Sequence, residues 1–434
     1  MAQPVISRIP FAPLGALISI IARNGGVDSR RLHHLLGMVL RYGLLEPFRI
    51  AERVVFDRAI EAHTLERDPI FILGHWRSGT SYLQTLLSQD PALTTSTVYR
   101  SIFADNFFIT EPWLKPVLNV IARVLRLPFS LQRLPLELDI PAEGDVALCS
   151  LFSPYSYTWG HLFPARFEHW LDHCVLRPGP EVAAGWIAHY DAFIRKLSMA
   201  SGGRQVVMKS PGDTARLALL LRQYPNARFV YIHRDPVAVF HSNRYLWDVI
   251  RREFSLQNIN DSDVDARILR TYQALLGSYL LQRDKIPASQ LVEIRYEALR
   301  ADPLSELRWV YHRLGLGEPP SGLTSFLSFQ KRYPTPTYKT PPELEARLRD
   351  VWSFSFAEWP EPVTSRSPSS SSRKGRASTT QTTTATTPCT TPTTPAPNTT
   401  QQSNRTAKQP SASSANTAAR RVKNRKLIHN PMFT

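Results

Sequence analysis

The sequence predicts an α/β fold in which a central parallel sheet is covered by helices on both faces. Short apolar runs of four or five residues recur along the chain, and each is bounded by polar or turn residues. Between them lie stretches in which apolar residues return every three or four positions, the spacing of one helix face. Strands that alternate with helices in this way form parallel sheets, and ligands bind at the carboxyl ends of their strands.

The individual elements follow from the same two patterns. Four buried strands are predicted, at residues 70–73, 205–208, 228–232 and 291–294. Helices are predicted before and between them, at residues 30–65 with an interruption at Pro47, and at residues 82–90, 214–222 and 266–282. Residues 92–200 are rich in proline and aromatic residues, so we expect short helices, long loops and a pocket for a second substrate there.

The 434 residues divide into three parts by composition. Residues 1–65 are expected to pack on the body as a helical segment, and residues 66–358 to form the domain that carries the chemistry. Residues 359–434 are rich in Ser, Thr and Pro and are predicted to be a disordered, basic tail.

The net charge is concentrated in that tail. Of the formal +16, residues 361–434 carry +10, from eleven Lys and Arg against one Glu. The remaining +6 suits an anionic ligand and does not require a nucleic acid. The tail is therefore interpreted as a solvated linker, with contact to nucleic acid or anionic lipid as the alternative.

No run of apolar residues is long enough to predict a membrane-spanning helix. The longest, residues 11–22, is expected to pack on the body as a helix, with peripheral contact to a membrane surface as the alternative. The three cysteines, Cys149, Cys174 and Cys389, form no CxxC pair and have no histidine at ligand spacing. We therefore expect neither a disulfide framework nor a metal site, and a cytoplasmic location.

A loop of small residues follows the first predicted strand. Its sequence is Gly74-His-Trp-Arg-Ser-Gly-Thr-Ser81, and a predicted helix begins at its end. Backbone N–H groups in such a loop can bind a phosphate together with the dipole of the following helix. The hydroxyls of Ser78, Thr80 and Ser81 and the guanidinium of Arg77 add further donors. The alternative is an ordinary polar turn with a Ser or Thr helix cap.

Two more cationic elements follow predicted strands. Arg234 comes just after the strand at 228–232, and Ser242 lies two helical turns further on, so the pair can bind another phosphate. Lys209 ends the strand at 205–208 and can supply a mobile positive charge. The alternatives are an Arg234 that pairs with Asp235 or Glu297, and a Lys209 that lies on the surface before a turn.

These elements together resemble the family of sulfotransferases that use 3′-phosphoadenosine 5′-phosphosulfate (PAPS). The resemblance extends from about residue 68 to about residue 352. It is closest to the bacterial-type branch and more distant from tyrosylprotein sulfotransferases. Three further segments carry it, namely DIPAEGDVAL at 139–148, PNARFVYIHRDP at 225–236 and IRYEALRADP at 294–303. The resemblance implies a three-layer αβα, P-loop-like fold and sulfonate transfer from PAPS to a hydroxyl or amine acceptor.

The resemblance also implies which residues bind the nucleotide. Five loop residues are expected to bind the 5′-phosphosulfate: Arg77, Ser78, Gly79, Thr80 and Ser81. Arg234 and Ser242 are expected to bind the 3′-phosphate. Tyr296 resembles a tyrosine that lines the nucleotide site, and Lys339 resembles a phosphate-contacting lysine near the end of the domain.

The reaction needs cations near the departing phosphate and a base near the acceptor. Arg77 and Lys209 are expected to stabilise the charge that develops on the bridging oxygen. Glu143 is the first candidate for the general base and Asp145 the second. His161 and His75 are alternatives.

The chain departs from the family pattern at two positions. Asp213 stands where a histidine is frequent, and Gly144 where an aspartate is usual. These departures keep a catalytically impaired nucleotide-binding protein open as an alternative function. A P-loop nucleotide phosphotransferase is a further alternative, although the GxxxxGK[ST] motif is absent from the sequence.

Overall fold

The computed structural model describes residues 12–125, 128–129, 134–135, 137–329 and 338–360. All of them belong to the first of the two units into which the chain divides, Met1–Thr364. The predicted tail at 359–434 lies outside the described residues except for its first two positions, and so does Cys389.

A five-stranded parallel sheet forms the centre of this unit, with the strand order β2-β5-β1-β6-β7. Its strands are β1 (Ile70–Leu73), β2 (Leu93–Thr95), β5 (Gln205–Lys209), β6 (Arg228–His233) and β7 (Leu291–Arg295). The prediction of a parallel sheet is therefore confirmed. The three-residue edge strand β2 was not predicted, because so short a segment has no readable alternation. A separate antiparallel pair consists of β3 (Pro128–Phe129) and β4 (Leu134–Pro135).

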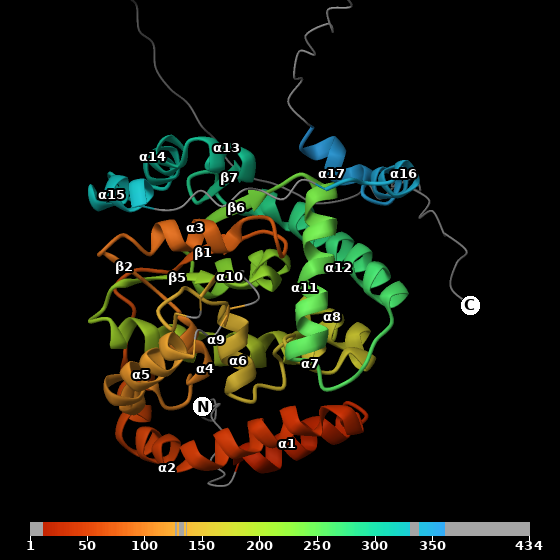
Figure 1. Cartoon of the computed structure of the whole chain (residues 1–434). Helices are drawn as coiled ribbons and strands as arrows, with labels where there is room; N and C mark the ends of the chain where they lie inside the picture. The colour runs from red at the N-terminus through yellow and green to blue at the C-terminus, as the bar shows by residue number, and fades with distance from the viewer. Residues whose placement is uncertain (1–11, 126–127, 130–133, 136, 330–337, 361–434) are drawn as a thin grey trace, which may run out of the picture. The chain divides into compact units, whose positions relative to one another are not determined.

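Helices cover both faces of the sheet, which gives three layers (Figure 1). In β1, Phe71 and Leu73 belong to the core on one face, whereas Ile70 and Ile72 belong to the core on the other. The first face carries α4 (Val98–Ile102), α6 (Gly144–Ser150), α9 (Pro180–Ala200), α10 (Leu217–Gln223) and α12 (Asp261–Gln282). The second face carries α3 (Thr80–Leu87), α13 (Tyr296–Ala301), α14 (Pro303–Arg313) and α15 (Gly322–Phe329).

The remaining helices extend or border these layers. They are α1 (Ala12–Arg23), α2 (Leu32–Ala62), α5 (Phe107–Val124), α7 (Trp159–Leu162), α8 (Phe167–Cys174), α11 (Pro236–Glu253), α16 (Pro342–Val351) and α17 (Ser353–Glu358). Four 3-10 turns join them to the rest: η1 (Ser29–Arg31), η2 (Pro164–Arg166), η3 (Pro211–Ala215) and η4 (Arg283–Lys285). None of the helices in the described ranges combines the length and apolar character needed to cross a bilayer.

Three predicted elements differ from the structure. Pro47 does not interrupt α2, which runs on through it. The proline's missing N–H leaves the carbonyl of Gly43 without a helical partner, and both residues are exposed, so water can replace that bond. Residues 92–200 hold two long helices, α5 and α9, rather than only short ones. The helix predicted from residue 214 begins at Leu217, after η3.

Candidate active site

The loop between β1 and α3 is tightly curved and closely packed. Gly74, Arg77 and Gly79 have φ values of 143°, 69° and 104°. A Cβ at Gly74 would lie 2.5 Å from the carbonyl oxygen of Ile232, and one at Gly79 would lie 2.3 Å from Cδ2 of Tyr296. The glycines are required because no side chain fits at either point.

The backbone N–H donors where this loop enters α3 are placed as in sites that bind an anion. Gly79 is the N-cap of the eight-residue α3, so the N–H groups of the first turn have no partner within the helix. The dipole of α3 adds positive potential at the same place. The hydroxyl of Ser78 stabilises the turn instead, because it donates to the carbonyl of His75 at 2.7 Å.

Arg234 lies against this loop because its strand is the neighbour of β1. In the parallel register Leu73 pairs with Tyr231, which places both carboxyl ends side by side. The guanidinium of Arg234 donates to the carbonyl of Arg77 at 3.1 Å and lies over the ring of Tyr296, 4.6 Å from its centre. The alternative of an ion pair between Arg234 and Asp235 or Glu297 is not what the structure shows: Asp235 caps α11, and Glu297 pairs with Arg295.

Ser242 joins the same cluster from the second turn of α11. Its Oγ accepts a hydrogen bond of 2.8 Å from Nε of Arg77, and the residue is buried. The structure therefore brings together Arg77, Gly79, Arg234, Ser242 and Tyr296, which come from three separate segments of the chain. The guanidinium groups of Arg77 and Arg234 both lie at this edge of the sheet.

Lys209 approaches from the other neighbour of β1. It ends β5, pairs in register with Ile72 and is only 2% exposed, so it is not a surface lysine. Its ammonium donates to Oε1 of Glu143 at 3.0 Å. Glu143 is the N-cap of α6 and keeps 24% of its side chain exposed. The sequence-predicted cation and the first candidate base are thus an ion pair.

Asp145 is part of the protein interior rather than of an open site. One carboxylate oxygen accepts hydrogen bonds from Ser156 Oγ at 2.6 Å, Thr158 Oγ1 at 2.7 Å and the Thr158 N–H at 3.0 Å. Complete burial raises its pKa. Asp145, the second candidate base, is thus a buried carboxylate that holds the turn before α7.

His75 is buried and His161 is partly buried, and burial lowers the pKa of each to about 4. Both imidazoles are therefore neutral near pH 7. The Nδ1 of His75 lies 2.9 Å from the carbonyl of Trp76, which makes that nitrogen the donor and leaves Nε2 as an acceptor. His161 lies between the rings of Trp76 and Trp247.

The two histidines line a narrow cavity of about 30 Å³ next to the loop between β1 and α3. Trp76 and Asn243 connect it to the loop and to α11, and the Asn243 amide donates to the Trp76 carbonyl at 3.0 Å. Most of the wall is apolar or aromatic, and it includes Tyr157, Phe167, Trp170, Leu171, Leu246, Trp247 and Ile268. At about 30 Å³ the cavity has room for about one or two water molecules, and its wall is mainly apolar.

The two departures from the family pattern are adjacent in space. Tyr190 donates its hydroxyl to Oδ2 of Asp213 at 2.6 Å, and burial raises the pKa of Asp213 to about 7 against the opposing charge of Arg216. A Cβ at Gly144 would lie 2.8 Å from Cε2 of Tyr190. The side chains of Tyr190 and Met208 thus occupy the space beside Gly144, where a Cβ would collide with both.

Sequence reasoning missed Tyr190, Ser210 and Arg216 in the wall of the site. Ser210 accepts a hydrogen bond from the N–H of Asp145, and the buried Arg216 lies over the ring of Trp186. Ser210 stands directly after Lys209 in a segment that was read for its lysine alone, whereas Tyr190 and Arg216 stand in no readable motif. Lys339 is exposed, and its neighbours Tyr338 and Thr340 both contact His241 on α11, one residue before Ser242.

The model of the sulfotransferase family matches residues 69–320 of the chain. A curated relative from Mycobacterium tuberculosis, omega-hydroxy-beta-dihydromenaquinone-9 sulfotransferase Stf3, is 29% identical over 306 residues, which cover 69% of this chain and 77% of the relative. The protein of the same name from Mycobacterium bovis matches to the same extent.

Solved structures of sulfotransferases have the same fold. STF9 from Mycobacterium avium matches with a TM-score of 0.59 and 18% identity, covering 82% of this chain and 98% of its own. STF1 from Mycobacterium tuberculosis matches with a TM-score of 0.57 and 17% identity, covering 79% and 91%. With the family model extending over more than half of the residues and the sheet, the loop and the cationic cluster in place, the chain belongs to the sulfotransferase family and is a PAPS-dependent sulfotransferase.

Proposed function

We propose that the cluster at the carboxyl ends of β1 and β6 binds the two phosphate groups of PAPS separately. The N–H groups of Gly79, Thr80 and Ser81 bind the 5′-phosphosulfate at the N-terminus of α3, with Arg77 beside them. Arg234 and Ser242 bind the 3′-phosphate. The observation that carries this assignment is the pair of hydrogen bonds from Arg234 to the Arg77 carbonyl and from Arg77 to Ser242.

Three other residues have supporting roles in this proposal. Ser78 acts indirectly, by holding the loop through the His75 carbonyl. Tyr296 packs over Gly79 and beneath Arg234, and so fixes the distance between the two anion sites. Lys339 adds positive charge next to α11, in the segment that contacts His241.

PAPS supplies the sulfonate, which passes to the acceptor oxygen as its bond to the phosphate oxygen breaks. Negative charge then grows on that phosphate oxygen, and cations placed there stabilise the transition state more than the ground state. We assign this role to Arg77 and Lys209. Lys209 is buried and held by Glu143, so its ammonium is positioned before the reaction starts.

The acceptor hydroxyl must lose a proton, and Glu143 is the group that we propose to receive it. Its carboxylate is the partly exposed member of the ion pair with Lys209, which places a base beside the cation that serves the departing group. His161 is the second candidate, because it is a neutral imidazole in the wall of the aromatic cavity.

We further propose that the acceptor is an alcohol with a long apolar portion, such as a hydroxylated isoprenoid quinone. The relative Stf3 bears the name of an omega-hydroxy-beta-dihydromenaquinone-9 sulfotransferase. The cavity beside the loop is lined mainly by aromatic and aliphatic side chains. This relationship also supports placing the chain in a bacterial-type branch of the family.

Transfer of ³⁵S-labelled sulfonate from PAPS to a panel of acceptors tests the acceptor class. The panel contains a hydroxylated isoprenoid quinone in detergent, the same quinone without its hydroxyl, a simple phenol and a hexose. Label is expected on the hydroxylated quinone and not on the deoxy control. Preferential labelling of the hexose would contradict an apolar acceptor.

A further inference from the structure

The long helix α2 has its polarity reversed relative to an ordinary surface helix. Three charged residues in its middle turn toward the protein: Arg49 pairs with Glu46, and Glu52, only 2% exposed, pairs with Lys196 of α9. Burial raises the pKa of Glu52. Surface helices normally present the opposite arrangement, with charges toward water.

The exposed side of α2 is apolar over most of its length. Of the residues from 32 to 55, those exposed are Leu32, His33, Leu36, Gly37, Leu40, Gly43, Leu44, Pro47, Ile50, Ala51, Val54 and Val55. Not one of these twelve side chains is Asp, Glu, Lys or Arg. At 1.5 Å per residue, this apolar stripe is about 36 Å long.

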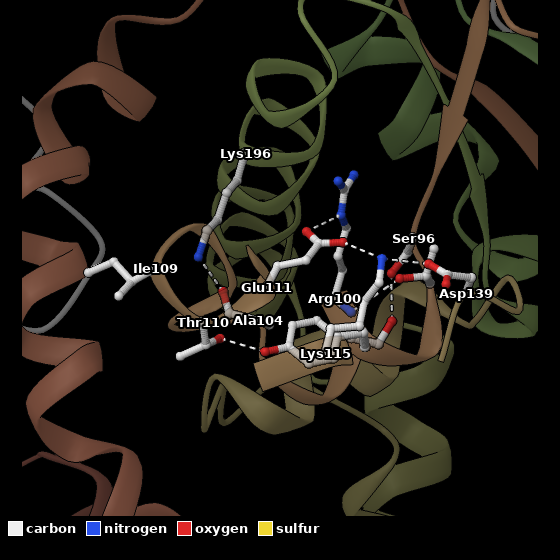
Figure 2. Close-up of polar contacts among 12 residues, drawn as sticks. Ser96, Arg100, Ala104, Ile109, Thr110, Glu111, Lys115, Asp139 and Lys196 are labelled. Atoms are coloured by element: carbon white, nitrogen blue, oxygen red, sulfur yellow. Dashed lines mark hydrogen bonds and ion pairs between the residues drawn. The ribbon is translucent and has the colours of Figure 1, made fainter. Parts of the chain in front are cut away.

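Helix α5 repeats the pattern beside it. Its acidic and lysine side chains turn inward: Glu111 bridges Arg100 and Lys115, and Lys115 reaches Asp139 (Figure 2). Its exposed large side chains are apolar, namely Trp113, Val117, Val120, Ile121 and Val124, followed by Leu125. The two stripes meet where the rings of Trp113 and Phe48 approach to 5.3 Å.

The exposed apolar side chains of the protein are concentrated on this face. The described residues include 17 large apolar side chains that are exposed, and 13 of them lie on α2, on α5 or at Leu125. Figure 1 shows α1 and α2 together along the lower edge of the view, on the far side of α9 from the sheet. Contiguous exposed patches of this kind mark sites of interaction.

We propose that the face formed by α2 and α5 is a docking surface for an anionic lipid bilayer. The charges at its borders are complementary to anionic headgroups: Arg23 and Arg30 are exposed just before α2, and Arg123 is exposed on α5. Arg58 and Glu61 lie together at the far end of α2. An apolar face with basic borders lies in the interface plane of a bilayer without crossing it.

A second copy of the chain suits this face less well. Pairing two such faces would bring their exposed arginines toward one another, and like charges at an interface oppose association. A layer of anionic headgroups instead attracts the same exposed arginines.

The position of this surface also bears on how an acceptor reaches the site. This inference, unlike the docking surface itself, rests on the proposed function. Trp170 lines the cavity next to the phosphate loop, and its indole N–H donates to the side chain of Asn24 at the end of α1, at 2.9 Å. Adsorption through the neighbouring α2 would therefore place the wall of the cavity close to the membrane surface. A lipid alcohol could then reach it without leaving the bilayer.

Flotation of the full chain with vesicles tests the docking surface without any acceptor. The vesicles contain phosphatidylglycerol and phosphatidylcholine in equal amounts, in about 0.15 M NaCl, and every variant keeps the basic tail, so the contribution of the tail is the same in each. The variant L40D/L44D changes two leucines that are 55% and 74% exposed, and L281D changes a leucine on α12 that is 81% exposed. Binding by L40D/L44D is expected to be at least about tenfold weaker than wild type, with L281D unchanged.

A second pair of variants separates a loss of vesicle binding from a folding defect. Trp113 and Trp309 are 46% and 50% exposed, so Trp113→Ala should weaken flotation and Trp309→Ala should not, while thermal unfolding stays unchanged in both. Failure of the wild type to float, or equal flotation by L40D/L44D and L281D, would overturn the proposal. A wild-type dimer in sedimentation that L40D/L44D converts to monomer, without vesicle binding, would assign the face to a second copy instead.

Discussion

The guanidinium Nε of Arg77 donates a 2.8 Å hydrogen bond to Oγ of Ser242, a residue 165 positions later in the chain. One partner belongs to the loop after β1 and the other to the second turn of α11. Because Arg234 also donates to the carbonyl of Arg77, the loop is held by two groups that follow β6. The two proposed phosphate sites are therefore parts of one hydrogen-bonded unit.

Lys209 should matter more for transfer than for binding. In Lys209→Ala the nucleotide keeps its contacts with the loop and Arg234, but the departing phosphate loses a positioned cation, so kcat should fall by about 10² to 10³. Steady-state kinetics and calorimetry with 3′-phosphoadenosine 5′-phosphate (PAP) separate the two effects. The exposed Lys285 provides the matched control, Lys285→Ala, which should leave both quantities unchanged. A large loss of PAP affinity with normal kcat in Lys209→Ala would contradict the role assigned here.

Replacing the carboxylate by an amide should mainly lower activity at Glu143 and mainly lower stability at Asp145. Glu143→Gln removes the proposed base and should lower kcat by about 10² to 10⁴. Because it also leaves the buried ammonium of Lys209 without its carboxylate, some loss of stability should accompany it. Asp145→Asn disturbs a buried acceptor of three hydrogen bonds, so its free energy of unfolding should fall by about 1–3 kcal/mol. Chemical denaturation and turnover of each variant provide the measurements. If Glu143→Gln kept full activity and His161→Asn lost it, the base would be the imidazole.

Gly79 should tolerate no side chain. Gly79→Ala forces a φ of 104° on alanine and places its Cβ 2.3 Å from Tyr296, so PAP binding should be lost and stability lowered by more than about 1 kcal/mol. The control is Gly277→Ala in α12, where a Cβ meets no atom within 4 Å. That variant should be stabilised by about 0.5–1 kcal/mol. Wild-type PAP affinity in Gly79→Ala would rule out the loop as the phosphate site.

Asp213 should make the protein less stable as the pH rises. Its pKa is about 7 in the folded chain and 3.8 as an ordinary value, so between those pH values the folded state holds a proton that the unfolded state has lost. Stability is then lost progressively across this window, by roughly 1.4 kcal/mol for each unit of difference. Asp213→Asn cannot titrate, and it should gain stability relative to wild type between pH 5 and pH 8. Parallel pH profiles of the two unfolding free energies would show that Asp213 is not a buried neutral acid.

The sequence predicted the parts of the fold that depend on local pattern. Three of the four predicted strands were readable as continuous apolar runs and the fourth, β7, from its alternating Val292 and Ile294, and the loop at Gly74 was readable from its small residues. Arg234 was expected near this loop because both follow predicted strands, but the order that makes β1 and β6 neighbours comes from the structure. Elements whose stability comes from tertiary contacts were not readable, such as the edge strand β2 and the continuation of α2 through Pro47.

The site was predicted less completely than the sheet. Lys209 and Glu143 were both named, but their ion pair joins residues 66 positions apart and has no local signature. Asp145 stands two residues after Glu143, in the first turn of α6, and only the packing of Ser156 and Thr158 shows that it is enclosed. Tyr190 lies in an ordinary amphipathic helix, so its bond to Asp213 could not be foreseen.

The central claim is that Arg234 and Ser242 form a site for a 3′-phosphate next to the loop at Gly79. Calorimetric titration with PAP and with 5′-AMP measures it most directly, because the two nucleotides differ only in that phosphate. We predict that the wild type binds PAP about 10- to 100-fold more tightly than AMP, and that Arg234→Ala removes most of this difference while Arg349→Ala preserves it. Equal affinities of the wild type for PAP and AMP would contradict the account.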